Sequence, residues 1–193
     1  MELLRTANAG ILLKMDGTSI LLDGVCRAFG PYLGTPEGMA LRADAIAFTH
    51  EHPDHYDASY AEKNLRLLMG PQAFGYTKKV GNLLVEAIPT RHIGKADCPH
   101  MSFRITGSQS LLFTGDASPL CWKDEPQCDV LVAPFAYAST KNGFDAARRL
   151  GKHIVIVHMP KPDMDEYGLW NAVRQTAGNS VQIPEIGETV CFP

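Results

Sequence analysis

Cysteine is scarce in this chain and never occurs in a paired motif. Five cysteines, an odd number, are spread over 193 residues, and no two of them form a Cys-x-x-Cys sequence. A chain of this length can bury enough apolar surface to fold without a disulfide framework. Scattered cysteines in such a chain are typical of a reducing compartment, where they pack as small apolar residues. We therefore expect a cytoplasmic protein.

Long apolar runs, a leader segment and an excess of positive charge are also missing. No run approaches the about 18 apolar residues that a membrane-spanning helix needs. The segment Met1–Arg5 is not a basic region followed by an apolar core, so we expect no signal peptide. The formal net charge of -3 provides no basic field for a phosphate backbone. We expect neither a membrane nor a nucleic acid as partner.

The composition is that of an ordinary globular domain. Hydrophobic residues make up 45% of the chain and charged residues 20%, which is typical of such domains. The length suits one domain, and no low-complexity segment or linker divides it. We expect residues 1–193 to form a single domain.

Short apolar segments alternate with turn residues along the whole chain. Asp16-Gly17 is a pair favoured in two-residue hairpins, and the segments on both sides of it are apolar. We expect strands at 11–15, 18–22, 45–48, 82–88, 103–106, 110–113, 129–133 and 153–157. We expect helices from Ser59 toward Leu68, around 144–150 and from about 165 to 177. Many strands with few helices predict an α+β fold of two sheets with helices outside.

The pattern His-x-His-x-Asp-His begins at His50 and includes three of the chain's seven histidines. Side chains two positions apart in an extended backbone point the same way, so His50 and His52 can reach one ion together. Pro53 ends the strand, and the turn after it can bring Asp54 and His55 toward a neighbouring position. Imidazole and carboxylate groups are ligands that zinc-like ions prefer. We therefore predict a metal site in this segment.

Three further candidate ligands stand at the ends of predicted strands. His92 follows the strand that ends near Ile88, Asp116 follows the strand 110–113, and His158 ends the strand 153–157. Strand ends that gather at one edge of packed sheets can converge in space although they are far apart in sequence. We expect all three side chains to lie near the histidine cluster.

These elements, in this order, resemble the metallo-β-lactamase superfamily. Its signature is His-x-His-x-Asp-His, followed by a lone His, a Gly-Asp after a strand and a final strand-end His. The early strand that ends in Asp23-Gly24 is similar too. The resemblance implies a four-layer αββα sandwich, with two packed mixed sheets, helices outside and the site at one edge of the sheets.

The resemblance also implies a role for each candidate. His50, His52 and His92 would bind a first metal ion; Asp54, His55 and His158 would bind a second; Asp116 would bridge the two. Asp23 would orient the ligand loop without touching metal. The metals would be two divalent ions, zinc first, with manganese or iron as alternatives.

Charge decides the chemistry that such a site supports. Two divalent ions bring four positive charges, whereas Asp54 and Asp116, the expected catalytic carboxylates, supply two negative ones. The excess favours a bound hydroxide, because a metal lowers the pKa of water from about 15.7 to about 7. We therefore expect a metal-dependent hydrolase that acts on a small-molecule substrate.

Three residues near the cluster have two interpretations each. Asp57 caps the following helix or orients a ligand. His100 faces the substrate or is an ordinary loop residue. Tyr137 lines the pocket or packs in the interior.

Within the superfamily, the strings 54–57 and 129–134 resemble the small branch of ascorbate-phosphate lactonase-like and phosphodiesterase-like proteins. This resemblance implies a small ester, lactone or phosphodiester as substrate. The alternatives are a non-catalytic protein that binds or senses metal, and a nuclease of the same superfamily. A complete ligand set favours the enzyme, and the net charge disfavours the nuclease.

Overall fold

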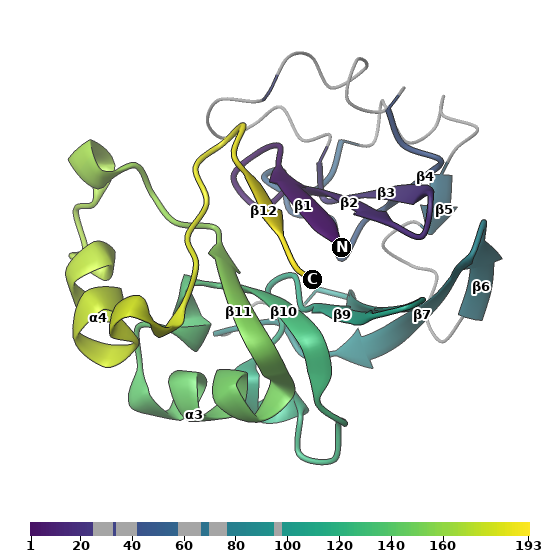
Figure 1. Ribbon diagram of the computed structural model, residues 1–193. Helices are drawn as coiled ribbons and strands as arrows, with labels where there is room; N and C mark the ends of the chain where they lie inside the picture. Colours follow the sequence, from purple (N-terminus) through teal and green to yellow (C-terminus); the bar gives the residue numbers. More distant parts are fainter. Residues whose placement is uncertain (25–32, 34–41, 58–66, 70–76, 95–97) are drawn as a thin grey trace.

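The computed structural model describes residues 1–24, 33, 42–57, 67–69, 77–94 and 98–193. Two β-sheets face each other, and helices lie outside one of them (Figure 1). Both sheets have six strands and contain parallel as well as antiparallel pairs. The prediction of two packed mixed sheets in an α+β fold is confirmed.

The first sheet has the order β12-β1-β2-β3-β4-β5. Its strands are β1 (Glu2–Arg5), β2 (Ile11–Met15), β3 (Thr18–Leu22), β4 (Ala45–Ala47), β5 (Leu67–Met69) and β12 (Thr189–Cys191). β2 and β3 form the predicted hairpin, in which Asp16 and Gly17 both have positive φ. β3 and β4 are parallel, so their carboxyl ends lie at the same edge.

The second sheet has the order β11-β10-β9-β8-β7-β6. Its strands are β6 (Thr77–Val80), β7 (Leu83–Thr90), β8 (His100–Thr106), β9 (Ser110–Phe113), β10 (Cys128–Pro134) and β11 (Gly151–Val157). β9, β10 and β11 are parallel, and β7 runs with β9 because each is antiparallel to β8. Four strands of this sheet therefore end at one edge.

The main core lies between the two sheets. Alternate residues of β2 and β3, such as Leu13 and Ile20, pack with Val85, Phe103 and Val132 of the other sheet, and each is fully buried. Burial of this apolar surface is the main force that holds the sheets together. The arrangement fixes the edge at which their strands end.

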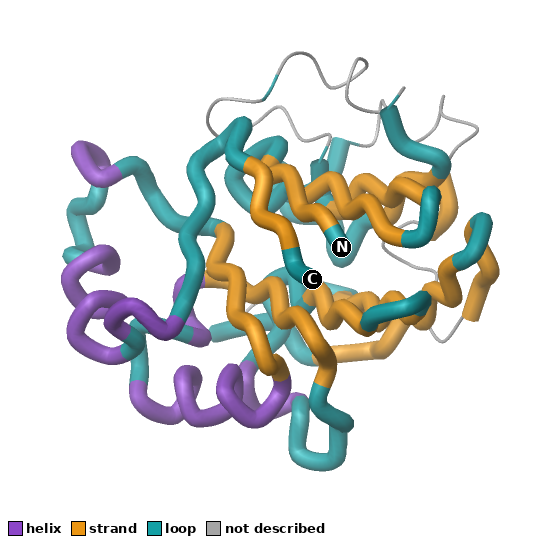
Figure 2. The backbone as a smooth tube through the Cα atoms, viewed as in Figure 1, coloured by secondary structure: helices purple, strands orange, loops and turns teal. Residues whose placement is uncertain are grey.

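The outer face of the second sheet is covered by α3 (Lys141–Leu150) and α4 (Leu169–Thr176) (Figure 2). Ala147 and Leu150 of α3 and Val173 of α4 are buried in one cluster with Leu131 and Ile156. The other apolar face of the first sheet is buried as well: Leu12, Leu21, Ala43, Ile46 and Phe48 form a third cluster.

One predicted helix starts later than expected, and another falls on residues that the structure does not describe. The helix expected from about 165 starts later, at Leu169, because Gly168 has a left-handed φ of 66° and the Asp165 carboxylate accepts the backbone N–H groups of Leu169 and Trp170. The helix expected after Ser59 lies outside the described residues, and Leu67–Met69 at its expected end is strand β5.

The described part of the chain contains no helix with the length and apolarity that crossing a membrane requires. Short 3-10 helices complete the described elements, at Pro119–Cys121, Phe135–Tyr137, Pro162–Met164 and Gly178–Ser180. Four of the cysteines are described, and no disulfide bond joins any two of these four: Cys98, Cys121, Cys128 and Cys191.

Candidate metal centre

The predicted ligands follow the carboxyl ends of strands from both sheets. β3 leads to Asp23 and β4 to His50 in the first sheet, and β7, β9 and β11 lead to His92, Asp116 and His158 in the second. Backbone hydrogen bonds join these ends: the N–H of Met101 donates to Thr49 at 2.9 Å, and that of Ile93 donates to Asp116 at 2.8 Å. Strand ends distant in sequence are thereby held at one edge.

The backbone is constrained at three of these positions. Asp23 and His158 have φ of 48° and 59°, a left-handed conformation that is uncommon for residues other than glycine. Gly115, with φ of 50°, precedes Asp116, and a Cβ there would lie 2.6 Å from the Thr49 side chain. Only glycine fits there without displacing Thr49.

Two clusters of ligand atoms match the two predicted metal positions. His50, His52 and His92 offer atoms that all lie within 4.8 Å of one another, and so do Asp54, His55 and His158. All seven predicted ligands are thus at one site, once the position of Asp116 is included.

Asp116 lies between the two clusters. Its Oδ2 is 3.5 Å from Nε2 of His55, 3.6 Å from that of His92 and 3.8 Å from that of His158. These separations are long for hydrogen bonds. They are close to the about 3.4 Å between two ligands of one tetrahedral ion with bonds of about 2.05 Å. The carboxylate is therefore placed to reach both positions.

Asp23 fixes the orientation of the ligand segment. This fully buried carboxylate accepts the backbone N–H of Thr49 at 2.8 Å, the Thr49 hydroxyl at 2.6 Å and Nδ1 of His55 at 2.7 Å. Its oxygens are occupied by these donors, although they lie near His50 and His55. These three hydrogen bonds support our proposal that Asp23 orients the ligand segment and does not bind metal.

The same contacts determine which ring nitrogen of each histidine carries the proton. The Thr49 hydroxyl gives its proton to Asp23, so it accepts from Nδ1 of His50, which lies 2.9 Å away. Nδ1 of His55 donates to Asp23, and Nδ1 of His92 donates to the carbonyl of Ile93 at 2.7 Å. In the neutral rings, Nε2 is consequently left with a free lone pair.

The Nε2 atoms of His50, His55 and His92 are buried and have no hydrogen-bond partner among the described residues. Unpaired buried polar atoms are rare in native proteins and call for an explanation. Nitrogen lone pairs that converge around a carboxylate are a donor set suited to a divalent cation. The residues present therefore fit bound divalent metal.

Electrostatics set the charge of each of these groups in the metal-free site. Burial lowers the pKa of His50 far below its usual value, with a further lowering by His55, so the ring is neutral at pH 7. Burial alone would raise the pKa of Asp116, but His55, His158 and His50 hold it well below its usual range. For His55, burial is outweighed by Asp23 and Asp116, which raise the pKa to about 10. The metal-free ring is therefore protonated at pH 7, and its Nε2 proton must leave before this atom can bind a metal ion.

Asp54 is half-buried and contacts the histidine at the end of β11. Its Oδ2 lies 2.8 Å from Nε2 of His158 and 3.8 Å from Nε2 of His55. Burial alone would raise the pKa of Asp54, but the hydrogen bond from His158 and the proximity of His55 lower it. Asp54 therefore offers a carboxylate at neutral pH.

The three residues with two interpretations lie in different surroundings. His100 is 2% exposed, and its ring centroid is 4.9 Å from that of His50. Tyr137 is fully buried and donates its hydroxyl proton to Ala117, which is a packing position from which we propose no substrate contact. Asp57 is half-buried and belongs to neither ligand cluster.

Thr49 was not singled out in the sequence, yet it links Asp23 to His50. Its position directly before the His-x-His motif was the only available signal. Thr90, whose hydroxyl contacts Nδ1 of His100, and Ser102, whose hydroxyl contacts that of Thr90, were also missed, because β7 and β8 had to be paired before these residues could be placed together.

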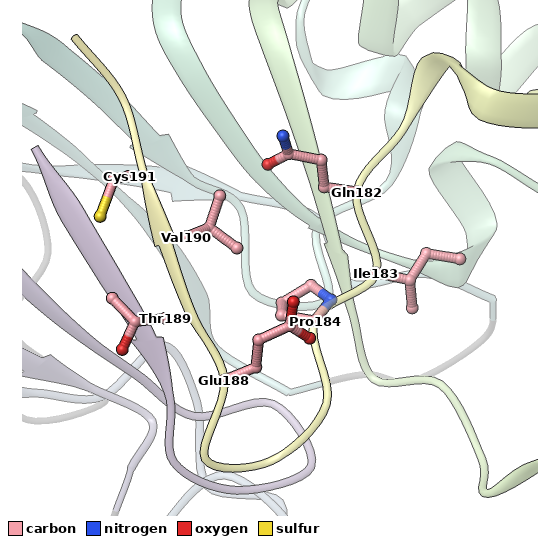
Figure 3. A pocket seen from close by; sticks show the side chains of 7 residues that line it. All are labelled: Gln182, Ile183, Pro184, Glu188, Thr189, Val190 and Cys191. Atoms are coloured by element: carbon pink, nitrogen blue, oxygen red, sulfur yellow. The ribbon is translucent and has the colours of Figure 1, made fainter.

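A separate cavity of about 390 Å³ lies beside β12 (Figure 3). It is lined by the segment Gln182–Pro184 and by Glu188–Cys191. None of the predicted site residues lines it, so it makes no contribution to the metal centre.

Two mixed sheets with a histidine and aspartate site at one edge define a protein of the metallo-β-lactamase fold. The family model described as the β-lactamase superfamily domain matches residues 6–157. The chain belongs to this superfamily, as its motifs predicted.

Known proteins agree with this assignment. A UPF0173 protein of Pyrococcus abyssi is 28% identical over 167 residues, which cover 76% of this chain and 75% of that protein. An isothiocyanate hydrolase from Delia radicum gut bacteria has a similar structure, with a TM-score of 0.72 and 16% identity over 100% of this chain and 99% of that one. Igni18, a metallo hydrolase from Ignicoccus hospitalis, gives a TM-score of 0.69 and 18% identity over 100% of this chain and 98% of that one.

Proposed function

We propose that this chain is a metal-dependent hydrolase that holds two divalent cations and cleaves a small ester, lactone or phosphodiester. This proposal is supported by the convergence of seven predicted ligand side chains. Three of them have buried Nε2 atoms without a hydrogen-bond partner among the described residues. Zinc is the first choice for this donor set, with manganese and iron as alternatives.

Two bound cations would supply a hydroxide from water at neutral pH and polarise the carbonyl or phosphoryl oxygen of the substrate. The protein contributes the arrangement of donors. Asp23 and Thr49 hold His50 and His55 in the tautomers that present Nε2 to the site. Preorganised ligands of this kind bind metal more tightly, because little ordering is left to be done on binding.

Asp54 and Asp116 are the proposed catalytic carboxylates. Both pKa values are lowered by neighbouring histidines, so both groups stay ionised at the pH where hydrolysis occurs. Two negative charges only partly balance two divalent ions. The site therefore keeps a net positive charge, which favours the negative charge that develops on the substrate oxygen during attack.

The test uses protein that is stripped of metal with a chelator and then reloaded with zinc, manganese or iron(II). The substrates are bis(p-nitrophenyl) phosphate, a panel of lactones and esters, and an isothiocyanate, which is included because of the hydrolase from Delia radicum gut bacteria. We expect metal to restore turnover of at least one substrate in the wild type and not in Asp116→Ala.

Each alternative has its own signature in this experiment. Two bound metals without turnover of any substrate would support a protein that only binds or senses metal. Cleavage of single-stranded DNA or RNA with greater efficiency than any small substrate would support a nuclease. Turnover that is unchanged in the stripped protein would refute metal-dependent hydrolysis.

A further inference from the structure

We propose that His100 is a hydrogen-bond acceptor of the active site, whose Nε2 binds an O–H or N–H group of the substrate or of the attacking water. This inference rests on the proposed hydrolase function and deepens it. It assigns to the site an eighth functional side chain, which recognises a proton donor and does not bind metal.

The tautomer of His100 follows from a chain of hydrogen bonds. The Ser102 hydroxyl donates to the carbonyl of Thr114 at 2.7 Å, which uses its only proton. Ser102 must then accept from the Thr90 hydroxyl, 3.1 Å away. With its own proton used, Thr90 accepts from Nδ1 of His100 at 2.7 Å. The neutral ring therefore carries its proton on Nδ1, and Nε2 has a free lone pair.

This lone pair is buried next to the metal centre. His100 is 2% exposed, and its Nε2 has no hydrogen-bond partner within the part of the chain that the structure describes. The ring lies 4.9 Å from the ring of His50 and 5.6 Å from that of His92, measured between centroids. Because the two nitrogens of an imidazole point to different sides of the ring, Nε2 faces away from Thr90, and the ring that carries it lies beside these two ligands.

The partner of Nε2 is a donor and not an anion. A nitrogen lone pair repels an oxyanion but accepts a hydrogen bond from a hydroxyl, an amide or a water molecule. Its buried position makes an unmade bond costly, so a site with this acceptor rejects a substrate that lacks the matching donor. A hydroxylated lactone or ester, or a substrate with an N–H group, has the expected chemistry.

The first experiment reads the tautomer without any turnover. Long-range ¹H–¹⁵N spectra of metal-free protein with ¹⁵N-labelled histidine should show the Nδ1–H form of His100. Thr90→Val removes the acceptor of that proton and should abolish the preference, whereas Thr90→Ser keeps the hydroxyl and should retain it. An Nε2–H tautomer in the wild type would overturn the proposal.

Loading with ¹¹³Cd then separates an acceptor from a ligand. We expect scalar coupling between ¹¹³Cd and Nε2 of His50 and His92, and none to His100. Coupling at His100 would make it a metal ligand and would overturn the proposal. Both readouts stand even if the protein hydrolyses nothing, so a failure of the proposed function remains distinguishable.

Kinetics identify the source of the donor. α-Hydroxy-γ-butyrolactone and its α-methoxy ether differ in one O–H group, and His100→Phe keeps the ring shape but loses the acceptor. A loss of about tenfold in kcat/KM for the hydroxy lactone alone would identify a substrate donor. An equal loss for both lactones in kcat, with KM unchanged, would identify water.

Two results of this comparison would contradict the acceptor role. One is unchanged kinetics of His100→Phe with both lactones, while Thr49→Val, which perturbs a metal ligand, slows both. The other is a loss of bound metal in His100→Phe, because an acceptor that binds no metal leaves the metal content at the wild-type level.

Discussion

Replacing Thr49 by valine should weaken metal binding without changing any ligand. The substitution keeps the shape of the side chain but deletes the hydroxyl that donates to Asp23 and accepts from His50. One buried bond to a carboxylate and one bond between neutral groups are lost, which costs about 2 to 5 kcal/mol of stability in the metal-free protein. His50 also loses the contact that fixes its tautomer, so we expect metal affinity to fall about 10- to 100-fold.

Thr49→Ser is the matched control. It keeps the hydroxyl and loses only the methyl group, which lies where a side chain on Gly115 would clash. Zinc affinity is measured by competition with a chromophoric chelator, and stability by urea unfolding of the metal-free protein. Wild-type zinc affinity in Thr49→Val, or an equal loss in both variants, would refute the role assigned to the hydroxyl.

Three further predictions concern catalysis, metal and pH. Asp116→Ala should lower the rate of hydrolysis more than about 100-fold, since even replacing a residue that only supports a ligand costs 10- to 100-fold. Its circular dichroism spectrum should be unchanged. Asp129→Asn is the control and should stay active, because this carboxylate is bonded to Ser110 and Lys152 away from the site. Chelation should destabilise the protein by about 4 kcal/mol for each occupied metal site, relative to free metal at 1,000 times Kd, read by thermal unfolding. Burial lowers the pKa of His100 to about 3. The contribution of its neutral ring to the free energy of unfolding is therefore fully present above pH 6.5 and is lost as the pH falls toward 3. Between pH 6 and pH 4, the metal-free His100→Phe variant should therefore lose about 2 to 3 kcal/mol less free energy of unfolding than the metal-free wild type.

Each of these predictions has a contradicting result. Residual activity above a tenth of wild type in Asp116→Ala would remove its bridging role. A thermal unfolding midpoint that is the same with and without chelator would argue against the expected stabilisation of the folded protein by bound metal. An acid-unfolding slope unchanged in His100→Phe would mean that its ring is protonated already in the folded protein.

Features encoded by adjacent residues could be predicted from the sequence. The Asp16-Gly17 turn defines the β2–β3 hairpin because both positions need positive φ, which these two residues tolerate. The ligands His50 and His52 were evident because alternate residues of an extended segment share a side. His92, Asp116 and His158 were predicted because each lies within three residues of the end of a strand.

Features that depend on pairing between distant strands could not be predicted. The link from Asp23 through Thr49 to His50 needs the parallel neighbours β3 and β4. The two interpretations of His100 could not be separated before Thr90 was placed opposite it in the β7–β8 ladder. These contacts determine the histidine tautomers, and they can be identified only after the distant strands have been paired.

Anomalous diffraction from zinc-loaded crystals would show whether two metal ions bind at this site. We expect two peaks per chain, about 3.5 to 4 Å apart, one beside His50, His52 and His92 and one beside His55 and His158. A single peak at another place on the protein, or no peak above noise after zinc loading, would contradict it.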